Sequence, residues 1–206
     1  LMRKADKALY LAKEKGKNRH IIYEERLHGK LETDDMQNMA MAYAVSKEKK
    51  REAITEMITE LCISGVNAIV KNEERLQQIR SLFDLDGITV FSDRGSRLVC
   101  RNGNYMAEAP DGRPGFEDEK YLALFGEDGI FVESNMLKLR SQNPAAFAVT
   151  QEQEIGAALQ CLSRKEGIPY TMVNFEVFNR NRKWSDEDVT LLTLLGHCIG
   201  DLLCRF

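Results

Sequence analysis

The clearest structural signal in this chain lies in residues 155–178, IGAALQCLSRKEGIPYTMVNFEVF. Two β-prone runs, Ala157–Leu162 and Tyr170–Phe178, flank the polar stretch Arg164–Gly167. Such a stretch ending in glycine is typical of the turn of a β-hairpin. The segment therefore predicts two antiparallel strands of one sheet.

Successive side chains of a strand point to opposite faces, so the hairpin has two distinct faces. In the second run, one face carries Thr171, Val173, Phe175 and Val177, and the other carries Tyr170, Met172, Asn174, Glu176 and Phe178. If helices cover one face and loops the other, a cavity can form on the loop side. The polar or amphipathic candidates to line such a pocket are Arg101, Tyr105, Gln160 and Asn174. The alternative is that these side chains simply face solvent.

Helical patterns lie on both sides of the strand-rich region. Residues 35–83 are predicted to be helical, with an apolar stripe formed by Ile54, Met57, Ile58, Leu61 and Cys62. Ser185 is predicted to cap a helix with an acidic first turn that runs to about Phe206.

The intervening residues favour short strands at Ile88–Phe91, Leu98–Cys100 and Gly129–Val132, and a helix at Pro144–Ile155. This order predicts an α+β domain, in which an antiparallel sheet packs against N- and C-terminal helices.

The composition narrows the classes of function. Hydrophobic residues make up 43% and charged residues 30% of the 206 positions, which is typical of a globular protein. The net charge of −3 provides no general attraction to nucleic acid, and no apolar run is long enough to span a membrane. We therefore expect neither a nucleic-acid partner nor a membrane span.

The cysteine and histidine content argues against disulfide and metal chemistry. The five cysteines are odd in number and form no CxxC pair, which disfavours a disulfide framework and fits a reducing cytoplasm. Only three histidines occur, which excludes a His-rich metal site. We expect no bound metal or cofactor in this chain.

The N-terminal residues 5–19, ADKALYLAKEKGKNR, resemble the closing helix and strand of the GGDEF (diguanylate cyclase) domain. The resemblance implies that Lys13 and Lys17 correspond to residues that contact GTP phosphates in that family. It also implies that residues 1–25 are a C-terminal remnant of such a domain. Lys17 replaces the usual arginine and loses its bidentate fork.

The GGDEF signature itself is missing, because the chain contains no Gly-Gly pair. We therefore expect no enzymatic activity in this fragment. The resemblance implies that the parent protein makes cyclic-di-GMP, and that GTP and Mg²⁺ belong only to the missing domain. A solvated basic helix end is the alternative explanation for Lys13 and Lys17.

The C-terminal 120 residues resemble GAF domains, on the basis of Ile155–Cys161, Val173–Val177, Arg182–Asp188 and Leu191–Leu192. The resemblance implies a GAF-like domain at 51–206, joined by a helical linker at 26–50. Met172 and Asn174 stand where small residues are common in that family, so a standard pocket shape is not implied.

The combined reading is a regulatory, sensory and dimerisation fragment of a bacterial cyclic-di-GMP signalling protein. Leu191, Leu194 and Cys198 form a second apolar stripe on the last helix, so we expect a homodimer through residues 36–62 and 189–206. The alternative is a GAF receptor for a defined small molecule or cyclic nucleotide.

Overall fold

The computed structural model describes residues 33–65, 73–92, 95–101, 104–106 and 118–205, together with Ala8, Ile22 and Glu24. The proposed GGDEF remnant, apart from those three positions, lies outside the described residues. The helices are α3 (Thr33–Ser64), α5 (Glu73–Leu82), α6 (Glu119–Leu122), the 3₁₀ turn η1 (Met136–Lys138), α7 (Leu139–Gln142), α8 (Pro144–Glu152) and α9 (Asp186–Arg205).

An antiparallel sheet forms the centre of the part of the chain that the structure describes. Its strands are β1 (Gly87–Ser92), β2 (Gly95–Arg101), β3 (Asn104–Met106), β4 (Ile130–Glu133), β5 (Ile155–Lys165) and β6 (Ile168–Phe178). Their order across the sheet is β3-β2-β1-β6-β5-β4. The predicted hairpin is confirmed as β5 and β6, and both strands are longer than predicted because they extend to the turn at Glu166 and Gly167.

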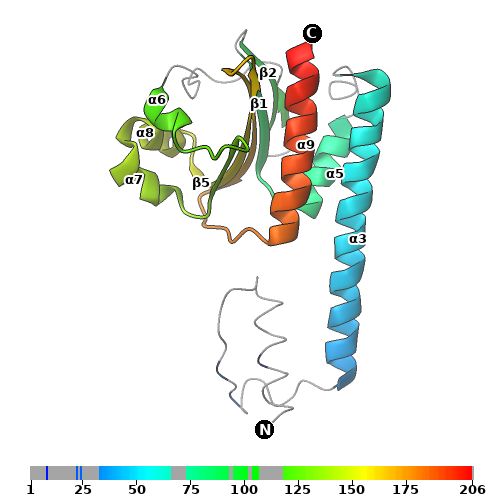
Figure 1. Cartoon of the computed structure of the whole chain (residues 1–206). Helices are drawn as coiled ribbons and strands as arrows, with labels where there is room; N and C mark the ends of the chain where they lie inside the picture. The colour runs from blue at the N-terminus through cyan, green and yellow to red at the C-terminus, as the bar shows by residue number, and fades with distance from the viewer. Residues whose placement is uncertain are drawn as a thin grey trace.

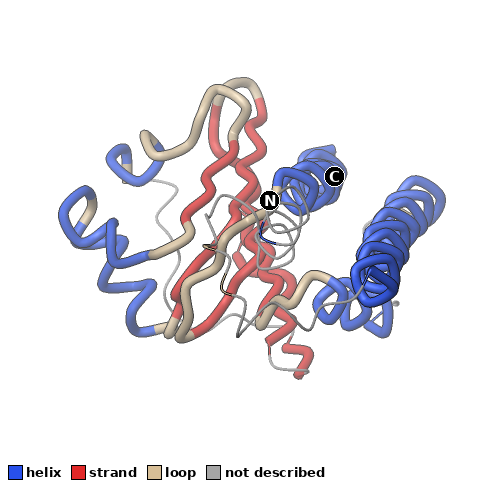
Figure 2. Tube along the Cα trace, turned by 90° about the horizontal axis from the view of Figure 1, so that it is seen from below, coloured by secondary structure: helices blue, strands red, loops and turns tan. Residues whose placement is uncertain are grey.

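Helices cover the two faces of the sheet unequally, as Figures 1 and 2 show. The long elements α3, α5 and α9 lie on one face, which we call the helix face. The short elements α6, η1, α7 and α8 lie on the other, which we call the distal face. This is the helix-backed antiparallel arrangement that the sequence predicts.

The larger apolar core lies between the sheet and the helix face. It includes Ile88, Leu159, Val173, Phe175 and Val177 from the strands and Ile54, Met57, Leu61, Leu192, Leu195 and Ile199 from the helices. α9 approaches β5 closely at Gly196, where an added Cβ would lie 2.6 Å from the Cys161 sulfur. The periodic leucines of α9 therefore bury against a tightly packed sheet, as their spacing predicts.

The first long helix extends past the body of the domain. α3 and α9 run in the same direction, and the N-terminal part of α3 continues beyond the start of α9 (Figure 1). In that part Met41, Tyr43 and Val45 are 70%, 49% and 46% exposed. α3 is one helix across residue 50, so the proposed boundary between linker and domain falls inside it.

A charged cluster joins α3, α5 and α9 at one end of the sheet. The Arg182 guanidinium donates to the Phe83 and Asp84 carbonyls and to Asp188 Oδ2, the last at 3.1 Å. Lys50 of α3 donates to the other oxygen of Asp188 at 2.7 Å. Asp188 lies in the first turn of α9, and its N–H donates to the predicted cap, Ser185.

The shortest elements, most of them on the distal face, were not predicted from the sequence. The helix predicted at 144–155 is confirmed as α8, which ends at Glu152. β3, α6, η1 and α7 are each three or four residues long, too short for a periodic pattern to show in the sequence. Among the described residues, none of the helices combines the length and apolar character needed to cross a membrane.

Candidate functional site

Four polar side chains lie together on the distal face of the sheet, away from solvent. Gln160 of β5 and Thr89 of β1 both pair with Asn174 of β6, one on each side of it. Glu176 lies two residues further along β6. We call Thr89, Gln160, Asn174 and Glu176 the polar row; each is 3% exposed or less.

The polar row interrupts an otherwise apolar layer. The neighbouring side chains on the same face include Ala158, Leu162 and Met172, which belong to the smaller, distal-face core. Burying polar groups costs free energy unless they are hydrogen-bonded. The row is therefore a feature that the apolar packing of this face does not explain.

The hydrogen bonds of the row are incomplete. The Thr89 hydroxyl donates to Glu176 Oε2 at 3.1 Å, and the Tyr121 hydroxyl donates to Gln160 Oε1 at 2.6 Å. Asn174 Oδ1 is buried and has no hydrogen-bond partner among the described residues. An unsatisfied buried acceptor costs about 1–3 kcal/mol, which a ligand donor can recover.

Tyr121 reaches the row from α6 on the distal side. Asp118 caps this helix by accepting from the N–H groups of Lys120 and Tyr121. The hydrogen bond from the Tyr121 N–H, followed by one from the Asn143 side chain, lowers the pKa of Asp118. Burial raises the pKa of the Tyr121 phenol, so its hydroxyl stays a donor to Gln160 at neutral pH.

The structure brings together two of the four predicted pocket residues. Gln160 and Asn174 face each other on the predicted loop side, and because both are buried the alternative of solvent exposure is wrong for them. Arg101 pairs with Gly87, which on its other side pairs with Glu176. Arg101 thus occupies the cross-strand position next to the polar row.

Tyr105 occupies a different row of the sheet. It pairs with Cys100, which pairs with Ile88, and Ile88 belongs to the helix-face core. The register therefore separates Tyr105 from Gln160 and Asn174. Lys13 and Lys17 lie outside the described residues.

Three residues of the site did not come from the sequence prediction. Glu176 lies two residues after Asn174 in β6 and therefore shares its face, so the predicted face of Asn174 also indicated that of Glu176. Thr89 sits within an apolar run that shows only that a strand is present. Tyr121 is 39 residues away from Gln160 in the chain, and no local pattern marks that pairing.

The chemistry of the polar row suits recognition of a ligand. Together with Tyr121, the row presents two carboxamides, a hydroxyl, a phenol and one carboxylate, all on strands or on a capped helix. Among the described residues, no group of three or more His, Cys, Asp or Glu side chains is placed to hold a metal ion.

Comparison with known proteins identifies the fold. No protein-family model matches the chain, and no curated protein matches it in sequence. Solved structures do match. A protein in its far-red absorbing dark state with bound biliverdin IXa has a TM-score of 0.51 and 17% identity, over 74% of this chain and 98% of that one.

Two further matches are similar in kind. The chromophore-binding domain of the Stigmatella aurantiaca bacteriophytochrome has a TM-score of 0.51 and 14% identity, over 76% of this chain and 60% of that one. The photoproduct state of GAF3 from a Synechocystis protein has a TM-score of 0.45 and 12% identity, over 68% of this chain and 94% of that one. The chain has a GAF-like α+β fold. At these identities the likeness concerns the fold alone.

Proposed function

We propose that this chain is a regulatory and dimerisation module in a bacterial cyclic-di-GMP signalling protein. The observation that carries the proposal is the extension of α3 beyond the domain with Met41, Tyr43 and Val45 exposed. Residues 40–45, AMAYAV, are apolar on every side of the helix. A helix of this kind is stable when another surface covers it.

Salt bridges tie this extension to the C-terminal helix. Lys47 and Arg51 of α3 lie 3.1 and 2.9 Å from the Glu187 carboxylate, and Lys50 bonds to Asp188. A displacement of α3 would therefore also move the start of α9. On α9, Leu194 is 55% exposed and is a further apolar side chain that a second copy could contact.

The link to cyclic-di-GMP rests on the resemblance of residues 5–19 to the end of a GGDEF domain. Two such domains must meet to join two GTP molecules, so a module that sets dimer geometry would control their output. In this proposal the module itself catalyses nothing, GTP and Mg²⁺ belong to the absent domain, and the protein works in the cytoplasm.

Sedimentation equilibrium tests the dimer. We expect the chain to dimerise at micromolar concentration, and Met41→Glu to weaken the dimer at least about tenfold, because it places a charge in an apolar contact. Gln142→Glu is the control, because it adds the same charge at an exposed position on α7, outside the residues proposed for the interface.

Two results would overturn the proposal. A monomer at high micromolar concentration would remove the dimerisation role. Formation of cyclic-di-GMP from GTP by this chain would contradict the assignment of catalysis to an absent domain.

The second candidate function is a receptor for a small molecule, and the polar row supports it. The buried Asn174 Oδ1 lacks a partner, and ligand pockets combine apolar walls with a few such converging polar groups. A thermal-shift screen with cyclic and linear nucleotides tests it. We expect a hit that stabilises the native chain and has no effect on Asn174→Leu. A hit that stabilises both proteins equally would place binding elsewhere.

A further inference from the structure

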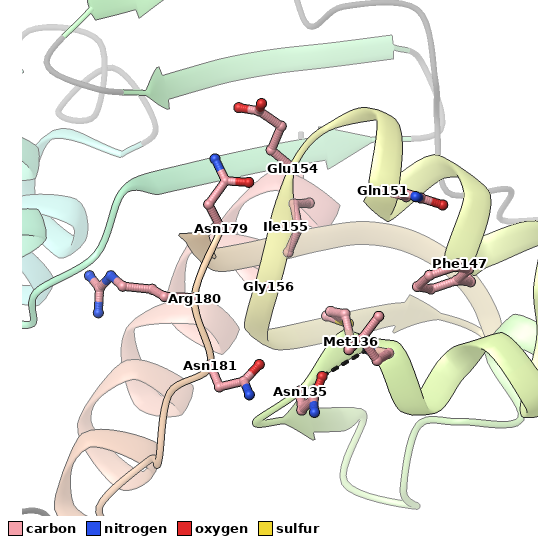
Figure 3. A pocket seen from close by; sticks show the side chains of 11 residues that line it. Asn135, Met136, Phe147, Gln151, Glu154, Ile155, Gly156, Asn179, Arg180 and Asn181 are labelled. Atoms are coloured by element: carbon pink, nitrogen blue, oxygen red, sulfur yellow. Dashed lines mark hydrogen bonds between the residues drawn. The ribbon is translucent and has the colours of Figure 1, made fainter.

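A cavity lies on the distal side, at the end of the sheet where β5 begins and β6 ends. Its volume is about 350 Å³, and it shares no residue with the polar row (Figure 3). Met136 and Ile155 are buried in its apolar floor, and Phe147 of α8 forms one wall. The volume is near the lower end of the range of about 300–1,000 Å³ for ligand pockets, which implies a small ligand.

The backbone around this cavity is held in an uncommon conformation. Glu154 and Asn179 have positive φ angles of 60° and 53°, and the Asn179 N–H donates to the Glu154 carbonyl at 2.8 Å. Next to them, a Cβ on Gly156 would lie 2.3 Å from the Arg180 carbonyl oxygen, so only glycine allows this approach. Non-glycine residues in the left-handed region occur often at ligand sites.

The polar groups at the rim determine which charge the cavity can accept. Arg180 points away from it (Figure 3), and its guanidinium binds the Asp84 carboxylate at 3.0 and 3.1 Å. The remaining lining charge is the Glu154 carboxylate. On the segment that follows β6, the Asn179 side chain lies on the same side of the cavity as Glu154, and the Asn181 side chain lies at the opposite end, near Asn135.

We propose that this cavity is a binding site for a small organic cation with an apolar body. The body contacts Ile155, Met136 and Phe147, and the cationic group is attracted to the Glu154 carboxylate and to the carboxamide oxygen of Asn179 beside it. An anion is disfavoured, because Arg180, the one arginine among the described lining residues, is already paired with Asp84. The inference is independent of the dimer and of the polar row.

A titration of the ¹⁵N-labelled chain with three matched probes tests the charge preference. Benzylammonium is the cation, benzyl alcohol the neutral analogue and benzoate the anion. We expect benzylammonium to shift the amide signals of Gly156, Asn179 and Asn181 at the lowest concentration, benzyl alcohol to do so more weakly, and benzoate not to shift them.

A pair of variants tests the role of the carboxylate. Glu154→Gln should weaken benzylammonium binding about three- to tenfold and leave benzyl alcohol binding unchanged, because it removes a charge without changing shape. Glu127→Gln, at an exposed position before β4, is the control and should bind all three probes as the parent chain does. Melting temperatures of both variants establish that each is folded.

Three outcomes would overturn the proposal. Benzoate binding as tightly as benzylammonium would contradict the charge preference. Shifts confined to other parts of the chain, or no shift up to about 10 mM benzylammonium, would show that the cavity is not a binding site for such cations.

Discussion

The helix face and the distal face of strands β5 and β6 bury different kinds of side chain. Along β6, Val173, Phe175 and Val177 enter the helix-face core, whereas Asn174 and Glu176 are equally buried on the distal face. The helix face also buries the hydroxyls of Ser163 and Thr171 but no carboxamide or carboxylate from these strands. Burial alone therefore does not distinguish the faces; the chemistry of what is buried does.

This difference indicates that the helix face stabilises the fold and that the distal face is available for ligand binding. The helix face combines three helices and a close α9–β5 contact, so it supplies most of the apolar burial. The distal face keeps polar groups that lower stability unless something binds them. The expected separation is that changes on the helix face alter folding and changes in the polar row alter binding.

The largest expected loss of stability comes from placing a polar side chain in the helix-face core. Val173→Asn replaces a fully buried apolar side chain of the helix-face core with a carboxamide. We expect the free energy of unfolding to fall by about 3–5 kcal/mol, from lost apolar burial and an unpaired amide. Urea denaturation measures it, and a loss below about 1 kcal/mol would contradict the assignment of stability to this face.

A slightly smaller loss is expected at the charged cluster that joins the helices at the sheet end. Arg182→Ala removes the donor to the Phe83 and Asp84 carbonyls and one partner of the buried Asp188. We expect a loss of about 2–4 kcal/mol in urea denaturation.

Arg182→Lys sharpens this second comparison. A lysine keeps the charge but cannot contact both carbonyls and Asp188 at once, so it should recover only part of the loss. Full recovery by lysine would mean that charge alone, and not the guanidinium geometry, holds the cluster.

A pH series probes burial on the helix face. Burial raises the pKa of the Cys161 thiol from 9.0 to about 12. The Cys161 thiol of the unfolded chain loses its proton at a lower pH than the buried thiol of the folded chain. The contribution of the thiol to the free energy of unfolding is therefore complete below pH 9 and is lost as the pH rises toward 12.

The variant Cys161→Ala isolates this contribution. Between pH 8 and pH 10 the parent chain should lose about 1 kcal/mol more unfolding free energy than the variant does. Parallel pH dependence of the two proteins would show that the thiol is not buried as described.

The smallest effect on stability is expected in the polar row. Asn174→Leu replaces a buried amide that lacks one partner with an apolar side chain of similar size. We expect the free energy of unfolding to change by no more than about 1 kcal/mol, in the stabilising direction if it changes at all. A loss as large as that of Val173→Asn would remove the distinction between the faces.

The sequence prediction was accurate where the pattern lies within a few neighbouring residues and failed where it depends on residues far apart in the chain. The ends of β5 and β6 were predicted to within three residues and those of α9 to within one, because alternation, turn glycines and caps involve only a few neighbouring positions. The face of Gln160 and Asn174 followed from the same alternation. By contrast, Tyr121 joins Gln160 across 39 residues, and Tyr105 is shifted to another row by a register that only strand pairing sets.

Local periodicity was thus enough to establish an antiparallel sheet with flanking helices and to assign each hairpin side chain to a face, since those properties depend on the nearest covalent neighbours. The burial of the polar row, the cavity beside Glu154 and the charged cluster at Arg182 depended on packing between distant segments. Each of them requires contacts between short elements or single side chains that are distant in the sequence. Such contacts form only when the whole core is packed.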